Sequence, residues 1–136
     1  MSKLLFQREL FFPSVFEGLN ICLDMVSEVE HLFNLDFDKS FALQTVLVES
    51  VENAFLHGNK GASDLDVRVY ISISASEIFL EVEDKGEGFD INSIPSPIEG
   101  DNIYNECGRG LFFIKSLCSS CYTMGKGNIV RIILER

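Results

Sequence analysis

Three polar side chains recur every four residues in an otherwise apolar stretch near the middle of the chain. They are Glu49, Asn53 and His57, and they lie within residues 41–58, which we expect to form a helix. Side chains four positions apart stack along one helix face. A carboxylate and an amide among apolar neighbours need polar partners, and a hydrated divalent cation with a polyphosphate would satisfy both. The solvated side of an ordinary amphipathic helix would show the same pattern.

A second stretch combines a carboxylate with two glycines where an expected strand ends. Asp84 is followed by Gly86, Gly88 and Phe89. A carboxylate accepts a hydrogen bond from the exocyclic amine of adenine, whereas guanine presents an oxygen there and would be repelled. Glycines let the backbone approach a base closely and adopt a positive φ. A turn with a flexible exit is the simpler interpretation of this short pattern.

A third stretch places glycines at the expected start of a helix. It reads Gly108, Arg109, Gly110 and Leu111. Backbone amides at a helix start bind phosphate, because they point at the ligand from the positive end of the helix dipole. Arg109 adds a positive charge. A tightly packed junction between loop and helix is the alternative.

The length, the charge and the hydrophobic pattern of the chain argue against nucleic-acid-binding, membrane-spanning and secreted proteins. The 136 residues suffice for one domain, which we place at residues 1–136, with 46% hydrophobic residues and a net charge of −10. The Lys and Arg residues are scattered, which argues against nucleic-acid binding. No apolar run reaches the roughly 20 residues of a membrane helix, and the first residues do not read as a secretion signal. We therefore expect a cytoplasmic protein.

Four cysteines remain to be explained: Cys22, Cys107, Cys118 and Cys121. Reduced thiols are the default in the cytosol. Cys118 and Cys121 have the spacing of redox pairs, but they fall at the end of a helical stretch rather than at its start. A zinc site would need further ligands. We expect cysteines that pack in the interior.

Alternating apolar and polar residues predict the strands that would position these groups. The alternation is strict over residues 65–74, which indicates one wet face, and a partner strand ends at Asp84. Pro13 ends an earlier strand, and a hairpin closes the chain. The expected strands are residues 3–12, 65–74, 78–84, 121–124 and 129–135.

Helical spacing predicts three helices. Ser14 and Glu17 form a capping box for the first, which reaches about residue 32. Asp38 or Ser40 can cap the second, which ends at Gly58, and the third spans residues 111–117. The order of elements predicts an α+β fold, a two-layer α/β sandwich whose mixed, mostly antiparallel sheet carries helices on one face.

The order and spacing of the three motifs closely resemble the N, G1 and G2 boxes of the GHKL ATP-binding superfamily, which has the Bergerat fold. The resemblance covers residues 41–114. Within that superfamily, Asn-Ala-x-x-His-Gly at residues 53–58 and Gly-Arg-Gly-Leu-Phe-Phe-Ile at residues 108–114 look like the anti-sigma-factor serine/threonine kinases of bacterial partner-switching systems.

The resemblance implies roles for the matching residues. Asn53 would ligate Mg²⁺ through its amide oxygen, Glu49 would act as general base or orient the attacking group, and Asp84 would bind the adenine amine. Residues 90–107 would form an ATP lid. The other implied nucleotide-binding residues are His57, Gly86, Gly88, Phe89, Gly108, Arg109, Gly110 and Leu111. Glu52 departs from the family pattern, and we expect it to point to solvent rather than to raise the pKa of Glu49.

The leading hypothesis is a serine/threonine protein kinase that uses ATP and Mg²⁺. It would phosphorylate a STAS-domain anti-sigma-factor antagonist and sequester a second protein such as a sigma factor. Many relatives dimerise, and the Phe-rich N-terminal strand offers a surface for a homodimer. The alternative is a non-catalytic, nucleotide-gated protein-binding module. The ATP-binding part of a sensor histidine kinase ranks last, because it would need dimerisation helices with an acceptor histidine. A plain ATPase would need a further domain.

Overall fold

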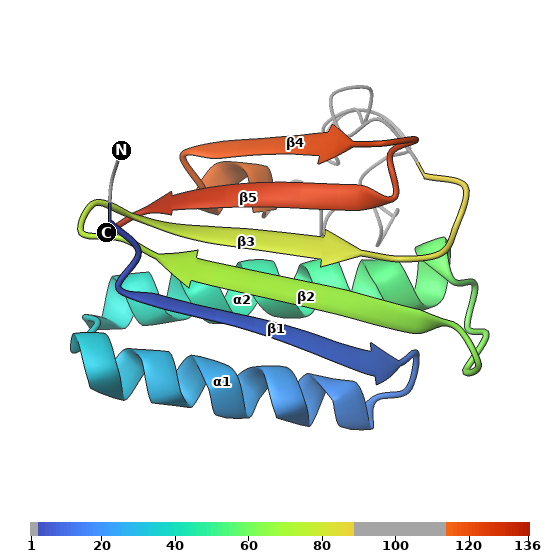
Figure 1. Ribbon diagram of the computed structural model, residues 1–136, viewed down its shortest axis with the longest axis horizontal. Coiled ribbons are helices and arrows are strands. Elements are labelled where there is room, and N and C mark those ends of the chain that lie inside the picture. Colours follow the sequence, from blue (N-terminus) through green and yellow to red (C-terminus); the bar gives the residue numbers. More distant parts are fainter. Residues whose placement is uncertain (1–2, 89–113) are drawn as a thin grey trace.

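The computed structural model describes residues 3–88 and 114–136, and a five-stranded sheet forms its centre (Figure 1). The strands pair in the order β1-β2-β3-β5-β4, and every pairing between them is antiparallel. The predicted α+β class is thus confirmed. The strands are β1 (Phe6–Pro13), β2 (Asp66–Ile73), β3 (Glu77–Glu83), β4 (Ser120–Met124) and β5 (Ile129–Glu135).

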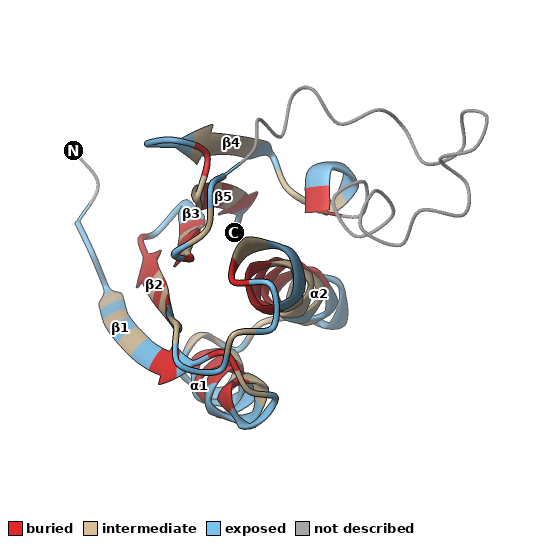
Figure 2. Cartoon of the chain, turned by 90° about the vertical axis from the view of Figure 1, so that its right-hand side faces the viewer, coloured by how far each residue is buried: buried red, intermediate tan, exposed pale blue. Residues whose placement is uncertain are grey.

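Two long helices cover one face of the sheet (Figure 2). They are α1 (Glu17–Phe33) and α2 (Phe37–Asn53), and α2 continues into a π-helical turn, η1 (Ala54–Gly58). Within residues 3–88 and 114–136, no helix has both the length and the apolar character needed to cross a membrane.

The core lies between the helices and the inner face of the sheet. Alternate residues of β2, beginning with Val67 and Val69, point inward and are fully buried, as period-2 patterning requires. From α2, Leu43, Val46 and Leu47 meet them, also fully buried. This packing fixes α2 against the sheet, so its polar side chains have defined positions.

Both predicted helix caps are wrong. Helix α1 begins after Phe16 without a side-chain cap. The Ser14 hydroxyl instead donates a 2.7 Å hydrogen bond to the carbonyl of Leu65, 51 residues away. Helix α2 begins four residues earlier than expected, because the Asp36 side chain accepts from the Lys39 amide at 2.8 Å.

The outer face of the sheet is polar, as the alternation predicts. Arg68 bonds Glu9 on β1 and Glu81 on β3, and Arg131 on β5 bonds the second oxygen of Glu81. These pairs run across neighbouring strands, where opposite charges support pairing. The two faces of the sheet therefore differ in role: the outer face carries ion pairs, and the helical face carries the core.

Candidate functional site

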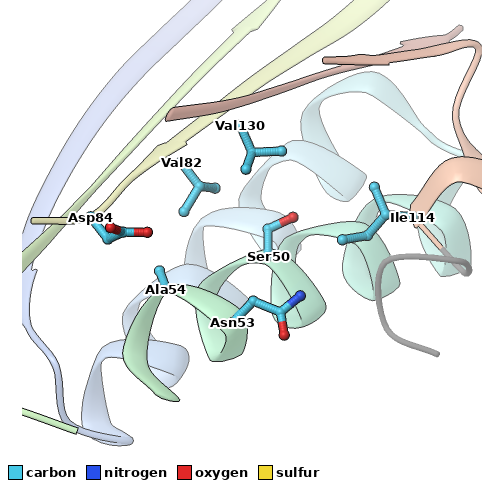
Figure 3. Close-up of a pocket in the computed structure, with 7 residues that line it drawn as sticks. All are labelled: Ser50, Asn53, Ala54, Val82, Asp84, Ile114 and Val130. Atoms are coloured by element: carbon cyan, nitrogen blue, oxygen red, sulfur yellow. The ribbon is translucent and has the colours of Figure 1, made fainter. Parts of the chain in front are cut away.

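A pocket lies between α2 and the inner face of the sheet (Figure 3). It contains about 290 Å³ of empty space, part of which is open to solvent. Most of its wall is apolar, and three polar residues line it, two from α2 and one from the end of β3. The lining residues are Ser50, Asn53, Ala54, Val82, Asp84, Ile114 and Val130.

Of the three polar residues predicted to share a helix face, only Asn53 lines this pocket. Glu49 is half-buried and His57 is exposed. For His57 the alignment fails because the helix widens after Asn53, where the Asn59 amide donates to the carbonyl of Ala54, five residues back, at 2.8 Å. A π turn advances less per residue than an α-helix, so side chains beyond it rotate out of line.

The Asn53 side chain has an unmet hydrogen-bonding need. Its Nδ2 atom is buried and has no hydrogen-bond partner among the described residues. Buried polar atoms without a partner are rare, because each costs about 1–3 kcal/mol. A half-turn of the amide exchanges Nδ2 and Oδ1, so the group can offer a ligand either a donor or an oxygen.

Glu49 carries a perturbed carboxyl group one helical turn before Asn53. Its pKa is raised, first by burial and then by the charge of Glu52. The expectation that Glu52 would leave the pKa of Glu49 unchanged is therefore wrong. A carboxylate with a raised pKa is a stronger base than one free in water.

Asp84 directly follows β3 and is 7% exposed. Its Oδ1 accepts a 2.7 Å hydrogen bond from the Gly86 amide, and Asn128 donates to its carbonyl oxygen at 2.8 Å. In Figure 3 the carboxylate faces the space that the Asn53 amide also borders. Burial raises the pKa of Asp84, although the hydrogen bond from Gly86 opposes the effect.

This raised pKa predicts a pH dependence of folding. The native state binds the Asp84 proton more tightly than the unfolded chain, so the stabilising contribution is complete below the unfolded pKa of about 3.9. It is lost as the pH rises through the native value. In ligand-free wild type, the free energy of unfolding should therefore fall as the pH rises from the unfolded pKa of Asp84 through its native pKa. In Asp84→Asn this fall should be smaller, as urea titration at several pH values measures. Asp24→Asn, on the exposed side of α1, controls for the loss of one charge; equal profiles for both variants would contradict the prediction.

The glycines near Asp84 allow segments of the chain to meet at close range. A Cβ on Gly58 would lie 2.2 Å from the Asp84 carboxyl carbon, and one on Gly86 would lie 2.1 Å from the Gly58 carbonyl oxygen. Gly88 has φ +87° and packs against the backbone of Lys126 and Gly127. Gly88 thus has the expected positive φ, whereas the same expectation for Gly86 is wrong. In the described structure Gly58 makes room for the Asp84 carboxylate, whereas Gly86 and Gly88 make room for other backbone, and neither Gly86 nor Gly88 lines the pocket.

Asn59 holds these segments together and was missed in the sequence. It is 2% exposed. Its Oδ1 accepts from the Lys85 amide at 2.7 Å, and its Nδ2 donates to the Ser14 hydroxyl at 2.8 Å and to the carbonyls of Leu65 and Asp66. One amide therefore links the end of η1 to the start of β2 and to the turn that follows Asp84.

Asn59→Ala should destabilise the protein by about 3 kcal/mol, because it leaves several buried polar groups without partners. Urea-induced unfolding measures the loss. Asn20→Ala, at an exposed position on α1, should change stability by less than about 0.5 kcal/mol. A loss at Asn59 no larger than that at Asn20 would show that the network contributes little.

Sequence reasoning also missed the apolar wall of the pocket. Val82 lies on β3 two residues before Asp84, so both side chains point to the same side of the sheet. Val130 is the partner of Val82 in the β3–β5 register. The alternation of residues along β3 indicates that Val82 faces inward. The sequence does not show that β3 pairs with β5, which is what brings Val130 beside Val82.

Four predicted nucleotide-binding residues of the G2 stretch, together with Phe89 and the predicted lid at 90–107, lie outside the described residues. The four are Gly108, Arg109, Gly110 and Leu111.

A family model described as a histidine kinase-like ATPase domain matches residues 13–134. The chain belongs to this family. No curated protein matches it closely enough to indicate a relationship. The family supports ATP binding and a kinase-like ATPase character. The matched range includes both long helices and strands β2, β3, β4 and nearly all of β5, but only the last residue of β1.

Two polar groups of the pocket have chemistry that suits parts of a nucleotide, the ligand expected of a histidine kinase-like ATPase domain. The Asp84 carboxylate can accept from an amine, and the unpartnered Asn53 amide can serve a phosphate or a cation. Among the described residues, no group of three or more His, Cys, Asp and Glu side chains is arranged to hold a metal. Mg²⁺ commonly binds through one or two protein oxygens, nucleotide phosphates and water, and Asn53 is the described residue that fits this role.

Proposed function

We propose that this domain is an ATP- and Mg²⁺-dependent serine/threonine protein kinase. Its substrate would be a small STAS-domain anti-sigma-factor antagonist, and it would also sequester a partner such as a sigma factor. The observation that carries the proposal is the placement of Asn53 and Asp84 on one pocket of a histidine kinase-like ATPase fold. The named partners and a homodimer rest on the resemblance of residues 53–58 and 108–114 to anti-sigma-factor kinases. A cytoplasmic location is proposed from the sequence features described above.

Adenine would occupy the inner part of the pocket. The base would lie against the apolar side chains of Val82, Val130 and Ile114, and its exocyclic amine would donate to Asp84. Oδ1 of Asp84 already accepts from Gly86, which orients the carboxylate and leaves Oδ2 for the ligand. This arrangement would favour adenine over guanine, because a carboxylate repels a carbonyl oxygen.

The phosphates would lie toward Asn53. Mg²⁺ held by the Asn53 oxygen would neutralise phosphate charge, which is most of what phosphoryl transfer requires beyond positioning. Glu49, one turn earlier on α2, would take the proton of the substrate hydroxyl or orient that hydroxyl. Its raised pKa suits a general base.

The test is transfer of label from γ-labelled ATP with Mg²⁺ to STAS-domain proteins of the host, added one at a time. Wild type should label a serine or threonine on one partner. Glu49→Ala should reduce labelling at least about 100-fold, the range for loss of a general base, while ATP affinity stays within a few-fold. Glu30→Ala, on α1 and hydrogen-bonded to Gln44, removes an equal charge and should label normally. Equal labelling by wild type and Glu49→Ala would refute the role of Glu49.

A nucleotide-gated binding module is the second candidate. The observation that favours it is that Glu49 does not line the described pocket, although Asn53 and Asp84 do. Such a module would bind ATP and change its affinity for a protein partner without labelling it. ATP binding by wild type with no label on any partner would support this alternative over the kinase.

A further inference from the structure

The exposed surface of the helix layer is acidic. Helices α1 and α2 together contain seven carboxylates but a single lysine, Lys39, and all seven carboxylates are exposed or half-exposed. Figure 2 shows exposed residues along the sides of both helices that point away from the sheet. The carboxylates belong to Glu17, Asp24, Glu28, Glu30, Asp38, Glu49 and Glu52.

Elsewhere in the described structure, ion pairs balance much of the charge. Arg68 and Arg131 pair with carboxylates on the outer face of the sheet. Of the helix carboxylates, only that of Glu28 forms an ion pair with a described residue, Arg8. Most of the net negative charge of the described residues therefore lies on α1 and α2. A surface with this excess attracts cationic groups and repels anionic ones.

Two phenylalanines project from this acidic surface at the start of α2. Phe37 is 81% exposed and Phe41 is 54% exposed. Their rings stack, with centroids 6.3 Å apart and an interplanar angle of 15°. Val48, which is half-exposed, lies two turns after Phe41 on the same side of the helix. The three side chains form an apolar strip along α2, and adjoining exposed apolar groups are typical of interaction sites.

The aromatic pair contributes little to the fold. The Asp36 side chain caps α2, and fully buried residues such as Leu43 and Leu47 anchor the helix to the core. The exposed rings are therefore available to a partner, and they can be replaced without loss of the core.

The charge beside the strip limits what can cover it. A second copy related by twofold symmetry would place the same acidic surface against itself, and like charges across an interface are unfavourable. Anionic lipids and nucleic-acid phosphates would be repelled for the same reason. A helix that carries apolar residues along one side and Lys or Arg beside them matches both properties, because helices dock on apolar surfaces through residues at helical spacing.

We propose that the outward side of α2, centred on Phe37 and Phe41, binds a basic amphipathic helix of a protein partner. The apolar side chains of that helix cover the two rings and Val48, and its cationic side chains face Asp38 beside the rings and Glu52 one turn after Val48. Docking here would serve the sequestration of a partner proposed above. It needs neither ATP nor label transfer, so each can fail without the other.

The test uses two fluorescein-labelled peptides of about five helical turns, both with leucine along one side. The remaining positions carry lysine in one peptide and glutamate in the other. Fluorescence polarisation should show that wild type binds the lysine peptide, with an affinity that falls as the salt concentration rises. The glutamate peptide should bind at least about tenfold more weakly.

The double variant Phe37→Ser, Phe41→Ser should weaken binding of the lysine peptide at least about tenfold, with a melting temperature close to that of wild type. Phe11→Ser is the matched control, because Phe11 is 62% exposed and lies on the outer face of the sheet. It should bind like wild type. Asp38→Asn should reduce the salt dependence, whereas Glu77→Gln, at an exposed position on β3, should not.

Four results would overturn the proposal. Wild type that binds neither peptide, or both equally well, would contradict the basic helix, and an equal loss in Phe11→Ser would show that the contact is not at α2. A dimer of wild type that the double variant lacks, detected by sedimentation equilibrium, would assign the surface to a second copy. Binding of phosphatidylglycerol vesicles by wild type but not by the double variant would assign it to a membrane.

Discussion

Asn53→Ala should abolish the Mg²⁺ dependence of ATP binding and raise the Kd for ATP at least about tenfold, or 1.4 kcal/mol. The amide is one of two polar groups of α2 that line the pocket, and its Nδ2 is buried without a partner among the described residues. Alanine removes both possible interactions with the phosphate end of the nucleotide. Isothermal titration with ATP, with and without Mg²⁺, measures the effect.

The same variant should fold at least as well as wild type when no nucleotide is present. Removing a buried group that lacks a partner costs little and can stabilise a protein. ATP with Mg²⁺ should then raise the melting temperature of wild type but not of Asn53→Ala. Ser50→Ala is the matched control, because Ser50 lines the same pocket but its hydroxyl already donates to the Val46 carbonyl at 2.6 Å. Wild-type affinity and Mg²⁺ dependence in Asn53→Ala would refute the site.

The strands were predictable from the sequence because they have one buried and one wet face. Alternation over residues 65–74 matches β2 at Asp66–Ile73 to within one residue at each end. Asp84 could be placed at a strand end for the same reason, since the alternation stops there. The helical stretch before Gly58 was also recognisable, and its packing brings Asn53 to the pocket that Asp84 borders.

The failures come from contacts between residues far apart in sequence. Ser14 and Glu17 have the spacing of a local cap, but the Ser14 hydroxyl is bonded instead to Leu65 and Asn59. His57 was placed in line with Asn53 by α-helical geometry. The close approach of Gly58 to Asp84 accompanies a π turn that no periodicity in the sequence signals. Local patterns identify elements, whereas long-range contacts decide how the elements end.

Gly86→Ala should destabilise the protein by about 3 kcal/mol or more, and it should weaken ATP binding beyond what partial unfolding explains. A Cβ at this position would lie 2.1 Å from the Gly58 carbonyl oxygen and 2.7 Å from its carbonyl carbon. Both are backbone atoms at the end of η1, so no side-chain rotation relieves the clash. The turn must move, and the Gly86 amide that orients Asp84 moves with it.

Gly61→Ala separates this clash from the general cost of replacing a glycine. Gly61 has φ +74°, and a Cβ added there would meet no described atom within 4 Å. Alanine at this position should therefore cost only the strain of a left-handed backbone, about 1 kcal/mol. Urea titration gives both stabilities, and ATP titration well below each midpoint gives the affinities. Similar losses in the two variants would mean that the segments at Gly58 and Gly86 separate easily. A much larger loss at Gly86 would show that their contact holds the Asp84 carboxylate toward the pocket.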